Sequence, residues 1–509
     1  MTKTSRRISH PLFNLLTLCF LFWNFPLPAA EPVPSFGPLY LEQCAVCHGE
    51  NLEGTPPGIP LAGRDLVHGS TLDELSTSIS NGFPISGMPA WEDVLNEEQI
   101  RSLALYIIEE RTNITYDTWN IETPLIIPRD VISTQHHDFR LEVIAEGIDP
   151  LPFSMEILPD GSFLVTEKTR GLRHISADGQ QSVQIQDAPK AYNPEENSRR
   201  GLGWLLEVKL DPNYQDNGWI YLQHGDWCDG CNAQSRRLGL AVSMNRIVRG
   251  RIRDNRWVDQ EVIFGFDIED YQAKSDIGAG GRIAFDDSGH LFFAIGAKGL
   301  DNYVGVQDLT LPWGKLHRIN MDGSIPDDNP YIDDPDILDS IWSYGHRSPQ
   351  GLEINPQTGD LWSTEMGPRG GDEVNFIRPM VNFGWPLHSL GINYNGTEVN
   401  YGREALEEEF DIDGIQLPIV DFTPSPAVSS IVFYEGAAFP GWNNDMLMGT
   451  MKARTLYRLT TDGDRVINRE VLFKDVGRIR DIEIGADGTP FLLMEQDEGS
   501  IIVRMSIAD

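Results

Sequence analysis

The tripeptide Pro159-Asp160-Gly161 stands shortly before the apolar segment Phe163-Leu164-Val165. Proline and glycine supply the backbone angles of a tight turn, and aromatic and β-branched residues favour a strand. The same succession occurs five more times, with turns at Asp211-Pro212-Asn213, Asp287-Ser288-Gly289, residues 355–359, residues 439–445 and Ala486-Asp487-Gly488. Six such units predict a six-bladed β-propeller over residues 139–509, with a jelly roll or two packed sandwiches as the alternatives.

Two shorter segments precede this β-rich region. Residues 113–138 lose apolar periodicity and contain Pro124 and Pro128, so we expect an interdomain linker there. Residues 31–112 are predicted to form a small all-α domain. Asn96 and Gln99 give the pattern of a capping box, and the following helix would bury Ile100, Leu103, Ala104, Ile107 and Ile108 on one face. Another short helix is expected over residues 71–80.

Cys44-Ala45-Val46-Cys47-His48 is the strongest local motif of the helical segment. Two thiols three positions apart on a helix can bond to the two vinyl groups of one haem, and the adjacent histidine can bind its iron. A disulfide or half of a zinc site are the alternatives, but no neighbouring residues complete a four-ligand zinc site. For the opposite side of the iron we predict Met88, between Gly87 and Pro89, with His68 as the alternative.

Residues 36–111 as a whole resemble a class I c-type cytochrome, on the strength of this motif and of the Met88 segment. The resemblance implies covalently bound haem c, with Cys44 and Cys47 as attachment sites and His48 and Met88 as iron ligands. It also implies single-electron transfer as the task. We therefore assign residues 31–112 to a cytochrome c domain.

Residues 1–30 have the layout of a secretory signal peptide. Lys3, Arg6 and Arg7 precede an apolar run over residues 12–27, and cleavage is expected near Ala30. A membrane anchor is the alternative, but the run is short for crossing a bilayer and no other stretch reaches 18 consecutive apolar residues. We expect an exported, periplasmic protein without stable membrane insertion.

Charge and cysteine content restrict partners and compartment further. Lysine and arginine number 40 against 76 aspartate and glutamate residues, which gives a formal net charge of −36 over 509 residues. Such a surface repels phosphate backbones, so nucleic acid is not expected as a partner. Beyond Cys44 and Cys47, Cys19 falls in the signal segment, and Cys228 and Cys231 are expected to form a disulfide, as is usual in exported proteins.

Arg478 and Arg480 would face the same side of a strand, because side chains alternate along it. Two like charges on one face require an anion opposite them. A surface pair that meets Asp or Glu is the alternative. Together with Arg347 and Lys452, the pair predicts a site for a polyanionic ligand.

Several ordered motifs resemble the soluble quinoprotein sugar dehydrogenases, the glucose and aldose dehydrogenases that use pyrroloquinoline quinone (PQQ). These motifs are Gly345-His346-Arg347-Ser348-Pro349-Gln350-Gly351, Gly367-Pro368, Asn382-Phe383-Gly384-Trp385-Pro386 and Arg478-Ile479-Arg480-Asp481. The resemblance covers roughly residues 140–509. It implies a six-bladed propeller, in agreement with the repeated turn and strand units.

The resemblance also implies the ligands of the site. The residues implied to bind the carboxylates of PQQ are all cationic: Arg347, Lys452, Arg478 and Arg480. The backbone carbonyls of Gly367 and Pro368 are implied to bind Ca²⁺, which also contacts the cofactor, since this ion prefers hard oxygen donors. Asp372 and Glu373 resemble acidic residues near a second, structural calcium ion.

The sequence departs from the family at the catalytic base. The position of the catalytic His is Gly278, that of its orienting Asp is Ala297, and the Asn after Arg347 is Ser348. A general base contributes on the order of 10²–10⁴ in rate, so the loss of both residues implies altered chemistry. Candidates for a replacement base, each also readable as an ordinary loop residue, are Asp276, Lys298 and Asp301.

These features predict a periplasmic quinohaemoprotein oxidoreductase. A sugar, or a related alcohol or aldehyde, would lose a hydride to Ca²⁺-bound PQQ, and electrons would pass through haem c to an external acceptor, a cytochrome or the respiratory chain. Fusion keeps donor and acceptor at high effective concentration. In an alternative, a propeller without its base acts as a binding or sensing module attached to an electron-transfer cytochrome. In a third, the propeller of a haem oxidoreductase only recognises a partner.

Overall fold

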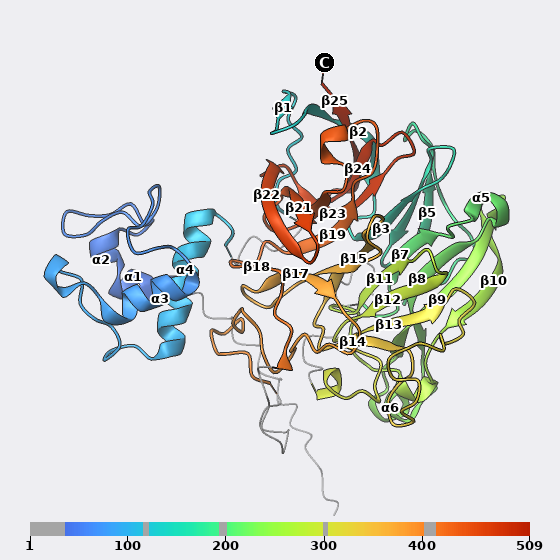
Figure 1. The fold of residues 1–509 in the computed structure, drawn as a ribbon, viewed down its shortest axis with the longest axis horizontal. Helices are drawn as coiled ribbons and strands as arrows, with labels where there is room; N and C mark the ends of the chain where they lie inside the picture. Colours follow the sequence, from blue (N-terminus) through green and yellow to red (C-terminus); the bar gives the residue numbers. More distant parts are fainter. Residues whose placement is uncertain (1–35, 116–121, 193–200, 299–303, 402–413, 509) are drawn as a thin grey trace, which may run out of the picture. The chain divides into compact units, whose positions relative to one another are not determined.

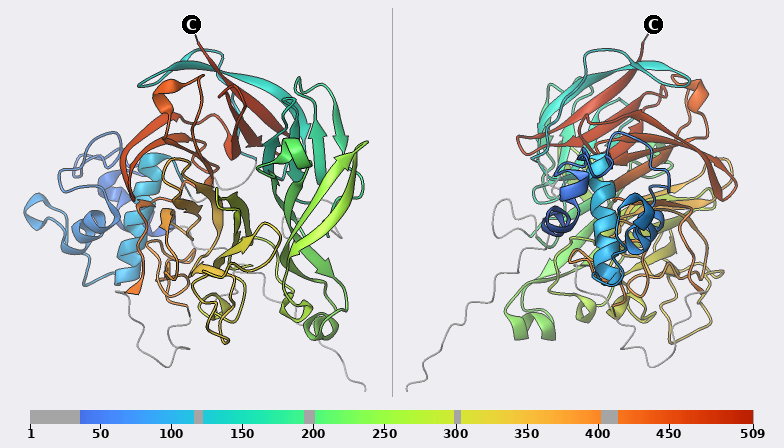
Figure 2. Two further views of the ribbon diagram at one scale, coloured as in Figure 1. Left: turned by 45° about the vertical axis from the view of Figure 1, so that its right-hand side comes forward. Right: turned by 90° about the vertical axis from the view of Figure 1, so that its left-hand side faces the viewer.

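A small helical domain comes first in the part of the chain that the structure describes. The structure is a computed structural model and describes residues 36–115, 122–192, 201–298, 304–401 and 414–508. The helices of this domain are α1 (Gly37–Gln43), α2 (Ala45–His48), α3 (Leu72–Asn81), the 3-10 helix η1 (Pro84–Ser86) and α4 (Glu97–Thr112). α4 is the long helix against which α1 and α3 pack (Figure 2). The predicted signal peptide over residues 1–30 lies outside the described residues.

Capping residues set the starts of α3 and α4. Thr71 N donates to Glu74 Oε2 at 2.9 Å, and the Thr71 hydroxyl accepts from Glu74 N. Asn96 and Gln99 form the same reciprocal pair, with Gln99 N donating to Asn96 Oδ1 at 2.8 Å. The predicted capping box is therefore confirmed, and the predicted apolar face is buried at Ile100, Leu103, Ala104, Ile107 and Ile108.

Six antiparallel sheets follow in the described residues, and they confirm the predicted six-bladed propeller (Figure 1). Blade 1 contains β3 (Pro152–Ile157), β4 (Phe163–Glu167), β5 (Gly171–Ile175) and β6 (Ser182–Gln184); blade 2 contains β7 (Leu205–Leu210), β8 (Ile220–Cys228), β9 (Val242–Arg253) and β10 (Arg256–Phe264). Blade 3 contains β11 (Gly280–Phe285), β12 (His290–Ile295), β13 (Lys315–Asn320) and β14 (Ile341–Tyr344); blade 4 contains β15 (Pro349–Ile354), β16 (Leu361–Glu365), β17 (Asp372–Ile377) and β18 (Val420–Phe422). Blade 5 contains β19 (Val428–Phe433), β20 (Met446–Thr450), β21 (Leu456–Asp462) and β22 (Arg465–Phe473).

The sixth blade joins the two ends of the propeller. It contains β23 (Arg478–Ile484), β24 (Pro490–Glu495), β25 (Ser500–Ile507), β2 (Asp138–Ile148) and β1 (Ile132–Ser133). β2 pairs antiparallel with β25, with Phe139 opposite Ile507, and the two strands lie side by side in Figure 1. This pairing closes the ring of blades. β1 falls inside the predicted linker 113–138, and Ile126 N donates to Val476 O at 2.7 Å, so the end of that segment belongs to the propeller.

The turn and strand units of the sequence correspond to one position in each blade. The predicted apolar segments lie in β4, β8, β12, β16, β20 and β24, the second strand of every sheet. The first strands, β3, β7, β11, β15, β19 and β23, contact one another in a closed ring and therefore line the axis. Short helices occur in the connections: α5 (Tyr214–Asn217), α6 (Ala233–Leu238), η3 (Ile268–Asp270), η4 (Val304–Val306) and η7 (Pro440–Trp442). Within the described residues, none of the helices has the length and apolarity required to cross a membrane.

Candidate functional site

Two arginines at the start of β23 face the axis, as their spacing predicts. Arg478 and Arg480 are each only 6% exposed. Both contact one carboxylate: Arg478 Nε donates to Glu495 Oε2 at 3.1 Å, and Arg480 Nε donates to Glu495 Oε1 at 2.6 Å. Arg480 Nη1 also donates to Gln350 Oε1 at 3.1 Å. The carboxylate of the surface-pair alternative is thus present, but it is buried and shared by two cations.

A further cation lies in the same layer. Lys168, directly after β4, is buried, and its charge acts on Glu495 together with those of Arg478 and Arg480. Burial opposes ionisation of Glu495, but these three positive charges outweigh it and lower the pKa of Glu495 to about 2. We call Lys168, Arg478, Arg480 and Glu495 the cationic layer, because three positive charges share one carboxylate.

An acidic layer lies further along the same inner strands. Its members are Glu156, Glu207, Arg282, Lys209, Glu353, Asp481 and Glu483. Arg282 Nη1 donates to Glu207 Oε2 at 2.9 Å and to Asp481 Oδ1 at 2.8 Å. Lys209 Nζ lies 3.4 Å from Glu483 and 4.0 Å from Glu353. Both cations of this layer therefore already have carboxylate partners.

Arg347 follows β14 and lies beside a pocket rather than in the cationic layer. Its guanidinium donates to Met366 O at 2.8 Å and to Tyr394 Oη at 3.2 Å, and it stacks 5.2 Å above Trp385. The lining of this pocket includes Arg347, Glu365, Gly367 and Glu373. The structure thus brings Arg347 next to Gly367, as the predicted cofactor and calcium site requires.

Carboxylates surround the predicted calcium-binding loop. Burial raises the pKa of Glu373 well above its usual range, and the neighbouring charges of Glu365 and Asp421 act in the same direction. Burial also raises the pKa of Asp372 to about 6, although its carboxylate accepts a 2.9 Å hydrogen bond from Gly367 N. Asp372 therefore fixes the backbone of the loop. No group of three or more His, Cys, Asp or Glu side chains within the described ranges is arranged to hold a metal ion.

Lys452 lies two residues after the end of β20 and is 8% exposed. Its backbone N donates to Pro426 O at 2.9 Å, and its charge acts on Asp372. Arg478 Nη2 lies 3.7 Å from Sδ of the preceding Met451. The charge of Lys452 thus acts at the predicted calcium-binding loop, while the adjacent Met451 contacts the cationic layer.

The candidates for a replacement base are engaged with each other. Lys298 Nζ donates to Asp276 Oδ1 and to Ser243 Oγ, the latter at 2.8 Å, and both charged side chains have 0% exposure. Asp276 Oδ2 also accepts from Trp204 N at 2.7 Å. This ion pair ties blade 3 to blade 2. Asp301 lies outside the described residues.

The positions of the absent catalytic pair do lie beside the site. Gly278 adopts a φ of +78°, and Ala297 is buried, with its N donating to Arg347 O at 2.7 Å. Gly296 lies between β12 and Ala297 and packs closely against Gly278. A Cβ added at Gly296 would lie only 1.9 Å from Gly278 O. A side chain at this point would displace the backbone next to Arg347.

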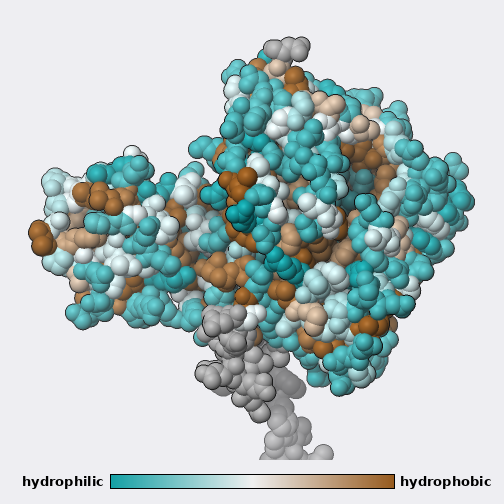
Figure 3. Space-filling view, in the orientation of Figure 1, coloured by the Kyte–Doolittle hydropathy of each residue, from teal (hydrophilic) through white to brown (hydrophobic). Residues whose placement is uncertain are grey.

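The haem motif stands at the junction of α1 and α2. His48 Nδ1 lies 2.9 Å from Ile59 O, and since a carbonyl only accepts, this nitrogen carries the proton and Nε2 stays available for iron. Met88 packs against the core of the helical domain, and His68 stacks on Phe83. Figure 3, in the orientation of Figure 1, shows apolar atoms at the surface of the helical domain. The exposed apolar residues around the motif and the Met88 loop include Val46, Ile59, Val67 and Ile85.

The helical domain contacts the propeller next to the predicted calcium-binding loop. Arg369, which follows Pro368, donates from Nη2 to Glu109 Oε2 at 2.6 Å and from Nε to Glu109 Oε1 at 3.0 Å. Both side chains are at most 3% exposed. Ser102 Oγ, also on α4, donates to Gly396 O at 3.3 Å. A buried, bidentate ion pair therefore links α4 to the loop that follows β16.

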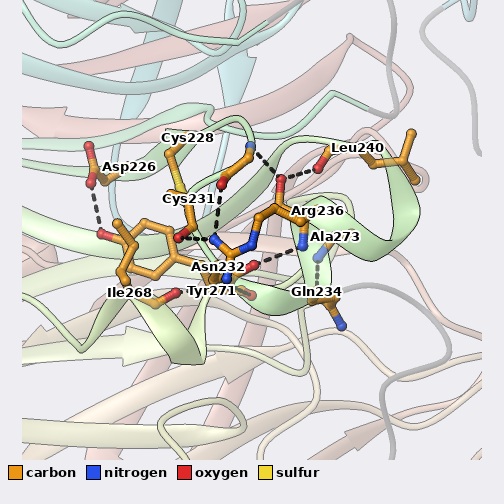
Figure 4. The surroundings of a disulfide bond; sticks show 12 residues. Asp226, Cys228, Cys231, Asn232, Gln234, Arg236, Leu240, Ile268, Tyr271 and Ala273 are labelled. Carbon is orange, nitrogen blue, oxygen red and sulfur yellow. Dashed lines mark hydrogen bonds between the residues drawn. A yellow bond between two sulfur atoms is a disulfide. The ribbon is translucent and has the colours of Figure 1, made fainter.

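Cys228 and Cys231 form the predicted disulfide (Figure 4). The loop after it is fixed by Arg236, whose Nη1 donates to Cys231 O at 2.8 Å, and by Asn232, whose amide donates to Tyr271 O at 2.9 Å. These bonds attach α6 to the loop after β8 and to the residue that follows η3. The disulfide therefore stabilises a loop of blade 2.

Four residues of the site have no role predicted from the sequence: Lys168, Glu365, Glu495 and Glu109. A signal for three of them exists, because β4, β16 and β24 all end in glutamate, at Glu167, Glu365 and Glu495. The apolar residues that predict the second strands do not mark these last positions. Glu109 has no such signal, since its partner Arg369 is 260 residues away.

Comparison with known proteins covers both parts of the chain. Residues 150–503 match the family Glucose / Sorbosone dehydrogenase, and residues 34–107 match Cytochrome C oxidase, cbb3-type, subunit III. Aldose sugar dehydrogenase YliI of Escherichia coli (strain K12) is 32% identical over 385 residues, 74% of this chain and 96% of that protein. Cytochrome c55X of Stutzerimonas stutzeri is 33% identical over 94 residues, 17% of this chain and 80% of that protein.

A solved structure agrees on the fold of the larger part. The PQQ-bound form of aldose sugar dehydrogenase from Streptomyces coelicolor superposes with a TM-score of 0.54 at 22% identity, over 73% of this chain and 98% of that protein. The family match covers most of the chain and includes all the axial residues described above. The chain therefore belongs to the Glucose / Sorbosone dehydrogenase family, and it carries a cytochrome c domain ahead of the propeller.

Proposed function

We propose that the propeller oxidises a sugar, or a related alcohol or aldehyde, with PQQ bound at its axis, and that electrons leave through haem c to an external acceptor. Family membership makes the chain an oxidoreductase. The observation that carries the cofactor assignment is the cationic layer. Among the described residues, Arg478 and Arg480 contact the single carboxylate of Glu495, and the charge of Lys168 acts on it as well, an arrangement that favours a polyanionic ligand.

The residues present fit PQQ. Bound PQQ would supply a quinone that accepts a hydride from the substrate. Arg478, Arg480 and Lys452 would bind its carboxylates, and Arg347 would contact it from the pocket beside Gly367. The Trp385 ring below the Arg347 guanidinium would hold that side chain in place. The Streptomyces coelicolor aldose sugar dehydrogenase, which has the same fold, was solved in a PQQ-bound form.

We also infer a calcium ion at the loop of Gly367 and Pro368. The pocket beside Gly367 is lined by the carboxylates of Glu365 and Glu373, which are oxygen donors of the type that Ca²⁺ prefers. Their mutual repulsion is one cause of the raised pKa of Glu373. A divalent cation would relieve this repulsion, and Asp372 would keep the loop backbone in position through Gly367 N.

The electron route is inferred from the contact between α4 and the propeller. Arg369, the partner of Glu109, is the residue next to Pro368. The helical domain is therefore attached beside the proposed calcium and cofactor site. In the helical domain, His48 and Met88 would bind the iron of a haem attached to Cys44 and Cys47. A fixed attachment of this kind keeps the two redox groups at high effective concentration.

The protein is inferred to act in the periplasm. Haem attachment through Cys44 and Cys47 and the Cys228–Cys231 disulfide both suit an exported protein. Residues 1–30 have the layout of a signal peptide. Determination of the N-terminal sequence of the protein purified from cells is the test. A mature N-terminus near residue 31 supports export, and retention of Met1 contradicts it.

Haem reduction tests the catalytic proposal. The purified chain with haem attached receives PQQ and Ca²⁺, then each member of a panel of aldoses, alcohols and aldehydes, while the reduced haem band is recorded. Reduction that depends on substrate, PQQ and Ca²⁺ together is the expected result. Absence of PQQ binding overturns the proposal. Binding without haem reduction across the panel supports the alternative, a propeller that acts as a binding or sensing module.

Matched arginine substitutions locate the cofactor. Arg478→Ala combined with Arg480→Ala should abolish PQQ binding, because both guanidinium groups of the cationic layer are lost. Arg504→Ala is the control: Arg504 belongs to the same blade but pairs with Glu142 at the surface, where both side chains are more than 40% exposed. Equal loss of binding in both variants would contradict the assignment of the axial pair.

A further inference from the structure

Lys168 is a buried lysine for which neither the sequence motifs nor the ion pairs of the fold provide a role. It follows the last residue of β4, and its backbone is fixed on both sides. Lys168 N donates to Leu151 O at 3.0 Å, and Lys168 O accepts from Leu205 N at 3.1 Å. The side chain is 7% exposed, and Nζ lies 5.5 Å from the ring centroid of Phe153 and 5.2 Å from that of Trp204.

The surroundings of this ammonium differ from those of the other deeply buried lysines. Lys298 Nζ donates to Ser243 and Asp276. Lys315 Nζ donates to four carbonyls, those of Gly305, Val306, Asp308 and Trp313. Within the described residues, Lys168 Nζ makes no hydrogen bond and no contact ion pair, and its contacts are the two aromatic rings. A buried ammonium without an acceptor is unfavourable, so this group fits an anionic ligand.

The charges around Lys168 come from residues of three strands. Arg478 and Arg480 lie on β23, Arg282 on β11, and Glu495 at the end of β24. Burial lowers the pKa of Lys168 to about 7, the positive charge of Arg480 acts next, and Glu495 opposes them. Without a ligand, a substantial fraction of Lys168 is therefore neutral at pH 7 to 8. A polyanion placed against these arginines would reverse the balance and favour the ammonium form.

We propose that Lys168 is a further binding residue for PQQ, which contacts a cofactor carboxylate beside Arg478 and Arg480 and takes up one proton from solvent when the cofactor binds. The inference rests on the proposed function, since it requires that PQQ occupies the axis. It adds a binding residue from blade 1 to the cations of blades 4, 5 and 6. It also couples cofactor affinity to pH, because the proton that Lys168 takes up becomes less available as pH rises above 7.

Titration calorimetry with PQQ and Ca²⁺ tests the inference on the full chain with haem attached. Measurement at pH 8 in two buffers of different ionisation enthalpy gives the number of protons taken up on binding. The wild-type chain should take up a large fraction of one proton, and its affinity should fall between pH 7 and pH 9. Lys168→Met, which preserves length without charge, should remove most of this uptake and weaken binding about 10- to 100-fold, the range for a charge-assisted hydrogen bond.

Two controls keep the outcomes distinct. Lys474→Met changes an exposed lysine before β23 and should leave affinity and proton uptake as in the wild type. Thermal unfolding without cofactor checks the fold, and Lys168→Met should unfold at the wild-type temperature or higher, because it removes repulsion by Arg478 and Arg480. Failure of the wild-type chain to bind PQQ would overturn the proposed function itself. Wild-type binding that Lys168→Met reproduces, in affinity and in proton uptake, would overturn the role of Lys168 alone.

Discussion

The cationic and acidic layers meet on strand β23, yet their charges are balanced in opposite ways. In the cationic layer, Arg478 and Arg480 contact Glu495, and the charge of Lys168 acts on it as well. In the acidic layer, Arg282 contacts two carboxylates, and Lys209 has Glu353 and Glu483 as neighbours. Both cations of the acidic layer have carboxylate partners within the protein, whereas the cations of the cationic layer have only Glu495 among the described residues and gain most from an added anion. The first therefore holds the blades together, and the second is suited to bind a ligand.

The difference also explains how residues at one axis can both hold the blades together and bind a ligand. A buried cation can remain charged without a ligand where carboxylates surround it, as Arg282 is by Glu207 and Asp481. Arg282 also donates to Gln350 O at 2.6 Å, which links blade 3 to blade 4. This layer is thus held together by ion pairs and hydrogen bonds within the protein. Rigid support of this kind limits the conformational entropy that binding must remove.

Arg282→Met should give the largest loss of stability. Removal of this guanidinium leaves Glu207 and Asp481 buried without their partner, so the free energy of unfolding should fall by about 3–5 kcal/mol. Guanidinium chloride denaturation followed by circular dichroism measures the change. Addition of PQQ should not restore it, because the lost interactions lie outside the ligand site. The exposed pair of Arg504 and Glu142 supplies the control, and Arg504→Met should change stability by less than about 1 kcal/mol.

Glu495→Gln should give a smaller loss that a ligand can compensate. The variant leaves Lys168, Arg478 and Arg480 without their shared carboxylate, and we expect unfolding to become easier by about 2–3 kcal/mol. A polyanion should replace the missing negative charge, so saturation with PQQ should raise the melting temperature of Glu495→Gln by more than that of the wild type. Equal ligand-induced shifts in the two proteins would show that the cationic layer does not contact the cofactor.

The architecture was largely readable from the sequence, because each blade repeats one local signal. Turn residues followed by an apolar strand identified the second strand of all six blades, and Asn96 with Gln99 identified the start of α4. Both signals are local and depend on neighbouring residues alone. The insertion of β2 beside β25 was not readable in the same way. In the sequence, β2 and β25 are separated by almost the whole propeller, and only the closure of the ring of blades brings them together.

The site was readable in part, for the same physical reason. Arg478 and Arg480 were found because alternate residues of one strand share a face. Their partner Glu495 and their neighbour Lys168 come from different strands, and no spacing in the sequence joins them. The ion pair of Asp276 with Lys298 likewise appears only in the fold, where both candidates for a base are seen to engage each other.

Opposite pH dependence of the two layers gives the smallest expected effect. Burial raises the pKa of Glu207 from 4.5 to about 7, against the attraction of Arg282. Between these values the folded protein binds more protons than the unfolded chain, so this group makes stability fall as pH rises from 4.5 to 7. Glu495 behaves in the opposite sense: its folded pKa is about 2, so its contribution is present above pH 4.5 and is lost as pH falls towards 2.

Melting temperatures across pH 3 to 8 measure both contributions. Glu207→Gln should flatten the decline between pH 5 and 7 by a few degrees, and Glu495→Gln should flatten the loss below pH 4.5. A Glu207→Gln profile parallel to that of the wild type would mean that the acidic layer is ionised throughout, and its contrast with the cationic layer would then rest on contacts alone.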